Sequence, residues 1–211
     1  MTRSKINTIL RILTETYPDA STRLQYYNLY QLMVAVVLSA QCTDEQVNKV
    51  TPALFKHYPD INCLAKADLN ELEKLINGVG LFRAKAKNLK ESAIIIRDKY
   101  SGQIPDQFED LLTLPGIGRK TANVIISVGF EKPGLAVDTH VQRVANRTGM
   151  AHTKMPHQTE MQLKKNIARN RWSQTHHLLI YHGRQICKAR NPLCDICPIE
   201  KYCEKNFEKD K

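Results

Sequence analysis

The chain has 211 residues, which is enough for one or two domains with a buried core. Apolar residues make up 42% and charged residues 25%, a composition that is ordinary for a globular protein and excludes a disordered, low-complexity chain. Lys and Arg total 31 against 21 acidic residues. The resulting charge of +10 favours a polyanionic partner. Charge alone favours a nucleic-acid-binding protein no more than a basic globular protein without such a partner.

The apolar segments exclude a membrane span and a signal peptide. The longest apolar run, 32–38, is far shorter than the roughly 20 residues that a spanning helix needs. Residues 1–13 interleave Ile and Leu with Arg and Asn, which is typical of an amphipathic helix. We therefore expect a cytoplasmic protein whose thiols stay reduced.

Helical periodicity runs through almost the whole chain, and we find no convincing strand or hairpin pattern. Segment 28–40 is apolar nearly all round, which predicts a helix at the centre of a core. Residues 94–96, three isoleucines, could also form a short strand, but they lack alternation and a partner. The sequence predicts an all-α fold with helices at 4–16, 28–40, 44–57, 69–77, 83–99, 107–113, 119–129, 139–148, 157–168 and 173–186.

Two short glycine-containing stretches resemble each other, 77–80 (NGVG) and 115–118 (PGIG). Each separates two helical patterns, which predicts two related helix–turn–helix connections. A weaker break follows at 131–134 (EKPG), where Pro and Gly end a helix. We expect a second compact unit to begin after this break.

The second of these turns carries the most information. A helix ends near Leu114, and Gly116 and Gly118 then permit positive φ and a close approach of the backbone to another group. A new helix starts near Arg119, and its first amides and its dipole form a site for one phosphate, beside which Arg119 and Lys120 add positive charge. A plain helix–turn–helix needs only a glycine-containing turn, but the full string LPGIGRKTA in a basic helical chain favours phosphate contact.

The six cysteines fall into two groups. Cys42 and Cys63 stand alone and are most simply buried apolar residues. In a reducing compartment, the spacing C-x6-C-x2-C-x5-C of the other four indicates a metal site. Four thiolates can hold zinc or a [4Fe-4S] cluster, and one tight pair with two looser ligands favours the cluster. These four are Cys187, Cys194, Cys197 and Cys203.

The hairpin, the segment 137–141 (VDTHV) and the four cysteines closely resemble endonuclease III, a family of DNA glycosylases and apurinic/apyrimidinic lyases of the helix–hairpin–helix superfamily. The resemblance covers essentially the whole chain, including 38–44 (LSAQCTD) and 182–184 (HGR). It implies two helical lobes with DNA in the cleft between them. One lobe is a bundle from 22 to 132 that carries the hairpin, and the other joins 1–21 to 133–211 and holds a structural [4Fe-4S] cluster.

By this resemblance, Lys120 matches the catalytic lysine of the family. Its amine attacks the deoxyribose C1′, expels the damaged base and forms an iminium that lets the 3′ phosphate leave by β-elimination. Because a helix start disfavours a charged ammonium, as partial burial would, we expect some neutral, nucleophilic amine at Lys120. The alternative is that Lys120 only binds phosphate.

Asp138 precedes a helical pattern, and its position alone predicts an N-cap. The resemblance assigns its matching aspartate to catalysis, either deprotonating the lysine or stabilising the cationic sugar. The two roles are compatible. We expect Asp138 and Lys120 to face each other across the cleft.

An enzyme that acts at C1′ must take its nucleotide out of the stack, and an inserted side chain commonly fills the gap. The resemblance makes Gln41 and Leu81 the candidates, whereas residue type alone favours a solvated glutamine and a leucine in a small apolar cluster. Lys188 and Arg190, in the loop between the first two cysteines of the cluster, are further candidates for phosphate contact. This loop departs from the family pattern, because 191 and 193 are Asn and Leu where basic residues are expected.

The resemblance therefore implies a monomeric base excision repair enzyme that removes oxidised pyrimidines from double-stranded DNA and nicks 3′ to the abasic site, in the cytoplasm and associated with the nucleoid. An adenine-specific relative is a close alternative, but such relatives lack a lysine at the position of Lys120. A non-enzymatic DNA-binding module is a second alternative, which would need neither Lys120 nor Asp138.

Overall fold

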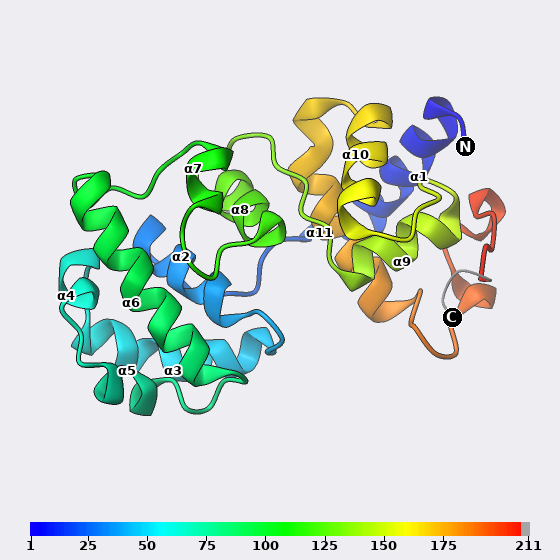
Figure 1. The fold of residues 1–211 in the computed structure, drawn as a ribbon. Coiled ribbons are helices and arrows are strands. Elements are labelled where there is room, and N and C mark those ends of the chain that lie inside the picture. The colour runs from blue at the N-terminus through cyan, green and yellow to red at the C-terminus, as the bar shows by residue number, and fades with distance from the viewer. Residues whose placement is uncertain (208–211) are drawn as a thin grey trace. The chain divides into compact units, whose positions relative to one another are not determined.

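The computed structural model describes residues 1–207, and Figure 1 shows helices joined by loops, with no strand among these residues. This confirms the predicted all-α fold. The strand alternative for residues 94–96 is wrong, because they lie inside the long helix α6 (Phe82–Lys99). The chain forms two compact units, one from Arg23 to Lys132 and the other joining Met1–Thr22 to the residues from Pro133 onward.

The unit from Arg23 to Lys132 is built on α2 (Leu29–Leu38), whose residues 32–38 are all buried, as the apolar pattern predicts. The Asn28 side chain caps this helix by accepting a hydrogen bond of 2.9 Å from the Gln31 amide. The helical periodicity did not predict the short helix α4. The other helices of this unit that precede the second turn are α3 (Asp44–His57), α4 (Ile61–Ala65), α5 (Leu69–Leu75) and α7 (Phe108–Leu112).

The helix predicted at 119–129 has two parts. An α-helix, α8 (Arg119–Val124), runs directly into a π-helical turn, Ile125–Gly129. A methyl group at Gly129 would overlap Leu29 and Leu32 of α2, and this glycine therefore lets the wider turn pack directly on the central helix.

The second unit is held by an apolar core between three helices: α1 (Arg3–Thr16), α9 (Thr139–Thr148) and α11 (Trp172–Gln185). Gly183 of α11 lies against α9, where a Cβ would be 3.2 Å from His140 Cβ. The same close approach lets Arg143 of α9 donate to the Gly183 carbonyl at 2.9 Å. The remaining elements are α10 (Pro156–Asn166) and short 3-10 turns at Arg169–Arg171, Cys194–Ile196 and Glu200–Tyr202.

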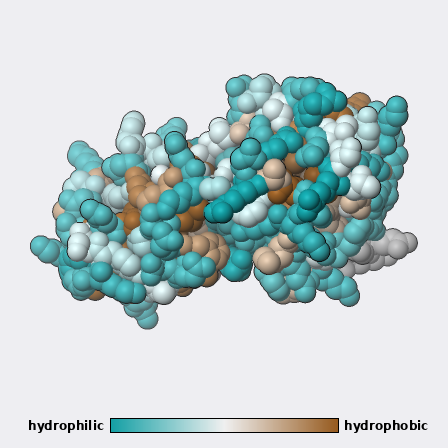
Figure 2. Space-filling model, turned by 90° about the horizontal axis from the view of Figure 1, so that it is seen from above, coloured by the Kyte–Doolittle hydropathy of each residue, from teal (hydrophilic) through white to brown (hydrophobic). Residues whose placement is uncertain are grey.

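Polar side chains cover most of the face seen in Figure 2, with smaller apolar areas between them. Among residues 1–207, no helix has both the length and the apolar character to cross a bilayer.

Candidate functional site

The second hairpin joins α7 to α8 through residues 113–118. Leu114 and Ile117 are buried beneath it, and the Ile117 amide donates to the Leu114 carbonyl at 3.1 Å. Ser92 of α6 fixes the turn from the other side, because its hydroxyl donates to the Pro115 carbonyl at 2.8 Å. The hairpin is therefore a fixed feature of this unit, with its glycines and cations at the surface.

The two glycines of this hairpin differ. Gly116 has a φ of 78°, as predicted, and a Cβ there would lie 3.0 Å from Asn88 Cβ. The expectation of positive φ at Gly118 is wrong: it has a φ of −93° and a ψ of 178°, the extended backbone of an N-cap. A Cβ on Gly118 would meet nothing within 4 Å. Gly118 therefore leaves open space at the start of α8, and the turn does not require its conformational freedom.

Arg119 and Lys120 occupy the first turn of α8, and both side chains are exposed. The Arg119 guanidinium lies over the Phe108 ring, 5.0 Å from its centroid, which holds this cation beside the helix start. Lys120 is not partly buried within its own unit. The part of the expectation that relied on burial is therefore not met.

Gln41 and Leu81 share an unusual backbone conformation. Both are exposed non-glycine residues in the left-handed region, with φ values of 54° and 58°. This region costs an L-residue about 1–2 kcal/mol, and such strain is concentrated at functional positions. The Leu81 side chain is 63% exposed, which excludes its alternative role in a small apolar cluster.

Asp138 is the N-cap of α9, as its position predicts. Its Oδ1 accepts hydrogen bonds of 2.9 Å from the amides of both His140 and Val141. Its Oδ2 lies 3.5 Å from His140 Nδ1, and the side chain is 15% exposed. Both carboxylate oxygens thus have defined neighbours, and the group remains accessible from solvent.

The four clustered cysteines line one pocket in the second unit, and none of them is in a disulfide. Arg147 of α9 shapes the loop that follows Cys187, because its guanidinium donates to the carbonyls of Lys188 at 2.7 Å and Ala189 at 3.0 Å. The side chains of Lys188 and Arg190 are exposed on this loop.

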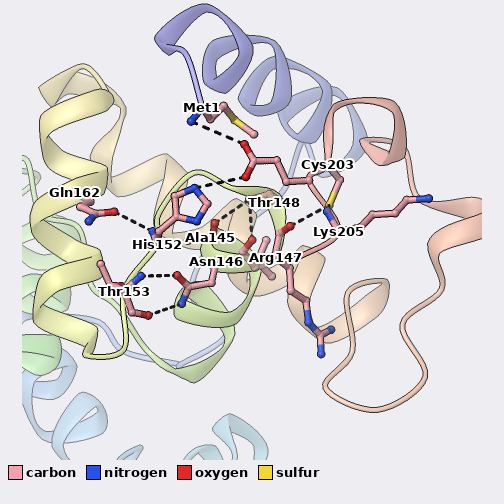
Figure 3. A network of polar contacts seen from close by, with 12 residues as sticks. Met1, Ala145, Asn146, Arg147, Thr148, His152, Thr153, Gln162, Cys203 and Lys205 are labelled. Atoms are coloured by element: carbon pink, nitrogen blue, oxygen red, sulfur yellow. Dashed lines mark hydrogen bonds and ion pairs between the residues drawn. The ribbon is translucent and has the colours of Figure 1, made fainter. Parts of the chain in front are cut away.

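Hydrogen bonds join the segment around Cys203 to the end of α9, as Figure 3 shows. The Cys203 thiol donates to the Arg147 carbonyl at 3.4 Å, and the Lys205 amide donates to Cys203 Sγ at 3.3 Å. The intervening Glu204 carboxylate lies 3.9 Å from the Met1 amine and 3.5 Å from His152 Nε2. The segment around the last cysteine is therefore held by contacts to α9, to His152 and to the N-terminal amine.

Comparison with known proteins places these features in one family. The model for "HhH-GPD superfamily base excision DNA repair protein" matches residues 34–169, and that for "Iron-sulfur binding domain of endonuclease III" matches 187–203. The endonuclease III of Synechocystis sp. is 46% identical over 95% of this chain and 92% of its own length, and that of Bacillus subtilis is 42% identical over 93% and 90%. A solved structure, described as a trapped endonuclease III–DNA covalent intermediate, superposes with a TM-score of 0.93 at 42% identity over 100% of both chains.

The chain belongs to the endonuclease III family. It is a DNA glycosylase and abasic-site lyase of base excision repair, and it carries a [4Fe-4S] cluster. These findings confirm the predicted enzyme class and cofactor. The alternatives of a non-enzymatic DNA-binding module and of a zinc site are wrong.

The pocket suits the cluster of an endonuclease III, because it brings together four sulfurs on mainly apolar walls. Burial raises the pKa of the Cys197 thiol to about 11. A thiolate at this position therefore depends on compensation by a cation, which iron supplies.

Sequence reasoning missed the role of His182 beside this pocket. Its Nδ1 lies 3.1 Å from the Tyr17 hydroxyl, and its Nε2 lies 3.6 Å from Cys197 Sγ. Burial lowers the pKa of His182 to about 4, and the neutral ring has only one N–H for these two neighbours. With Cys197 bound to iron as a thiolate, which can only accept, Nε2–H would donate to the sulfur and the Tyr17 hydroxyl would donate to Nδ1. The available signal was the position of His182 on a helix that ends just before Cys187.

Proposed function

We propose that this chain removes oxidised pyrimidines from double-stranded DNA and then cleaves the strand 3′ to the abasic site, with Lys120 as the nucleophile. The observation that carries the proposal is the place of Lys120. Its amine is exposed in the first turn of α8, two residues after Gly118, a glycine that leaves open space. The trapped covalent intermediate of the solved relative supports a covalent route.

The proposed reaction has two stages. The neutral amine of Lys120 attacks C1′ of the deoxyribose, the glycosidic C1′–N bond breaks, and the base leaves with a proton. Ring opening gives an iminium between Lys120 and C1′. Loss of the C2′ proton then drives cleavage of the C3′–O bond, and the 3′ phosphate leaves. Hydrolysis of the remaining imine returns the amine.

Asp138 is the proposed partner of Lys120 in this chemistry. Its carboxylate takes the proton from the lysine ammonium or stabilises the positive charge that develops on the sugar. The two amide hydrogen bonds to its Oδ1 fix the orientation of the carboxylate, which supports this role. The proposed catalytic role of Asp138 and its role as N-cap therefore rely on the same side-chain conformation.

The remaining predicted residues are proposed to contact DNA. Gln41 and Leu81 fill the gap left by the extruded nucleotide, which their exposure and strained backbone support. The second hairpin binds one phosphate, and the cysteine loop adds further cationic contacts to the backbone. The residues in these two groups are Gly116, Gly118, Arg119, Lys188 and Arg190.

We further propose that Cys187, Cys194, Cys197 and Cys203 hold the [4Fe-4S] cluster, which supplies a structural cross-link for a segment with little core of its own. The purified protein should be brown and contain iron. Cys203→Ser should lose iron and unfold the segment after Cys187, measured as increased hydrogen exchange there. Full iron content in this variant would contradict the ligand assignment.

We also propose that the enzyme acts as a monomer on nucleoid DNA in the cytoplasm, and that its two domains are 22–132 and 1–21 with 133–211. Borohydride trapping on duplexes that carry an abasic site, an oxidised pyrimidine or an adenine mispair tests the chemistry. We expect a covalent complex with the first two duplexes and none with Lys120→Gln. Trapping by Lys120→Gln, or exclusive action on adenine, would overturn the proposal.

A second variant separates the two roles of Asp138. Asp138→Asn keeps an oxygen for the cap and removes the charge, and most of the stability should therefore remain. We expect base release at least about a hundredfold slower than in the wild type. Near-normal release would assign Asp138 to capping alone.

A further inference from the structure

Lys85 of α6 is a charged residue in the interior of the first unit. Only 5% of it is exposed, and its ammonium group donates two short hydrogen bonds, to the carbonyls of Leu38 at 2.8 Å and Ala40 at 2.7 Å. Burial lowers the pKa of this amine. A buried lysine is costly unless it is well paired, and its contacts therefore need an explanation.

The two acceptors lie at the end of α2, where helix carbonyls have no amide partner. The Ser39 amide donates a hydrogen bond of 2.9 Å to the Ala35 carbonyl, and the Ser39 hydroxyl donates one of 2.8 Å to the Val36 carbonyl. The Lys85 ammonium donates to two further carbonyls, those of Leu38 and Ala40. Its positive charge also suits the negative end of the helix dipole.

Lys85 is bonded to both loops that present a strained residue. Its backbone amide donates to the Leu81 carbonyl at 3.0 Å in the first turn of α6. Its ammonium holds the carbonyl of Ala40, the residue before Gln41. The loops also approach each other closely, because a Cβ added to Gly80 would lie 3.5 Å from the Gln41 carbonyl oxygen. One residue thus links the backbone at Leu81 to the backbone next to Gln41.

We propose that Lys85 is a positioning residue that holds Gln41 and Leu81 together as one preformed pair for insertion into DNA. The inference rests on the proposed function, in which these two side chains fill the gap left by the extruded nucleotide. A left-handed conformation persists at a non-glycine residue only when its surroundings impose it. Without the ammonium, the Ala40 carbonyl is released, and the loop at Gln41 can leave that conformation before DNA arrives.

This role predicts an effect that depends on the substrate. A paired lesion in a duplex must be extruded and its gap filled, whereas an abasic site in single-stranded DNA leaves no gap in a duplex. Loss of Lys85 should therefore slow the first reaction and spare the second. A residue that only stabilised the fold would affect both substrates equally.

The test compares Lys85→Met with Lys87→Met under single-turnover conditions. Methionine keeps the apolar stem of Lys85 and removes its charge. Lys87 is an exposed lysine on the same helix, 3.9 Å from Glu91, and serves as the matched control. For Lys85→Met we expect base release from a duplex with an oxidised pyrimidine to fall about tenfold, and cleavage of single-stranded abasic DNA to stay within about twofold. The control should match the wild type on both substrates.

Equal losses on both substrates, or no loss on either, would overturn the positioning role. Failure of the proposed function looks different, because the wild type would then form no borohydride-trapped complex through Lys120. If Lys85→Met does not fold, Lys85→Arg replaces it, since arginine keeps the charge but displaces the donor. The same duplex-selective loss is expected of Lys85→Arg, and equal losses on the two substrates would again count against the proposal.

Coupling to Leu81 provides an independent readout. If Lys85 acts through the inserted pair, Leu81→Ala should slow duplex base release less in the Lys85→Met background than in the wild type. Strictly additive effects of the two substitutions would show that Lys85 and Leu81 act separately.

Discussion

The two glycine hairpins of the first unit share a turn hydrogen bond and a buried middle residue, but they differ in backbone conformation and in surface. In the hairpin between α5 and α6, the Val79 amide donates to the Ile76 carbonyl at 3.0 Å, and in the hairpin between α7 and α8 the Ile117 amide donates to Leu114 at 3.1 Å. Val79 and Ile117 are both buried. The middle residue of each Gly-x-Gly string therefore anchors its turn in the core, and this shared plan explains why the two sequences look alike.

The hairpins differ in where the left-handed residue falls. In the second hairpin it is Gly116, before the anchor, and the helix that follows opens with two cations. In the first hairpin it is Leu81, after the anchor, and this apolar side chain projects into solvent as the N-cap of α6. The middle residue of each Gly-x-Gly string thus supplies the buried anchor, whereas the residues around it determine the backbone conformation and the surface. We propose that this surface binds a phosphate in the second hairpin and fills a gap in stacked bases in the first.

The largest expected effect comes from removing Lys120, a cation that follows the second hairpin. Lys120→Gln should reduce strand cleavage at an abasic site at least about a thousandfold, because the nucleophile is lost. Arg83→Gln is the matched change after the first hairpin, at a residue 3.8 Å from Glu73 on the surface. It should cost less than about threefold. Gel assays of single-turnover cleavage measure both, and similar losses for the two variants would remove the distinction between the hairpins.

Leu81 should show opposite effects on function and stability. Leu81→Gly removes the inserted side chain and relieves the left-handed conformation, which costs leucine about 1–2 kcal/mol. Base release from a paired lesion should fall about tenfold, while the free energy of unfolding should stay level or rise by up to about 1 kcal/mol.

The matched variant for this prediction is Leu81→Ala, which loses the same side chain but keeps the strained backbone. It should lose the same activity without any gain in stability. If Leu81→Gly were less stable than Leu81→Ala in urea unfolding, the strain at this position would not be real.

Local patterns were sufficient for most of the fold. The apolar run of α2 predicts a buried central helix, and the two glycine strings predict both connections between helices. Resemblance to endonuclease III supplied the enzyme class and the cluster, because spacing alone left zinc open. The residues of the candidate site were also chosen largely by resemblance, and their roles stay predictions.

The sequence could not predict contacts that depend on distant parts of the chain. Lys85 bonds to a carbonyl 47 residues away, and His182 bonds to a tyrosine 165 residues away. Neither pairing leaves a local pattern. The conformation of Gly118 was predicted wrongly for a related reason, since a glycine can mark either positive φ or open space, and only the neighbouring atoms decide between them.

Gly116 and Gly78, the first glycines of the two hairpins, should differ in how much their replacement by alanine lowers the free energy of unfolding. Gly116→Ala places a methyl in the left-handed region and 3.0 Å from Asn88 Cβ, and it should lower the free energy of unfolding by about 1–2 kcal/mol. At Gly78 a Cβ would lie 2.5 Å from Gln46 Nε2, the end of a flexible side chain that can move aside, and 3.3 Å from Val50 Cγ1, a contact that a small shift of the side chain relieves. Gly78→Ala should therefore cost less than about 0.5 kcal/mol. Urea unfolding of the cluster-loaded protein checks both, and a reversed order would show that the two turns differ in some other way.

The smallest expected effect is that of Gly118→Ala. Comparing it with Arg119→Gln distinguishes the effect of filling open space from the effect of removing a charge. The extended backbone of Gly118 accepts alanine, and a Cβ there would meet no protein atom within 4 Å. The free energy of unfolding should therefore change by less than about 0.5 kcal/mol. If a phosphate approaches the backbone at this point, the added methyl should weaken duplex binding about threefold, with an unchanged dependence on salt because no charge is lost.

Arg119→Gln should instead reduce the slope of log affinity against log salt by about one. Unchanged affinity for Gly118→Ala in fluorescence anisotropy would mean that the phosphate lies elsewhere, and the open space beside Lys120 would then be available to the sugar alone.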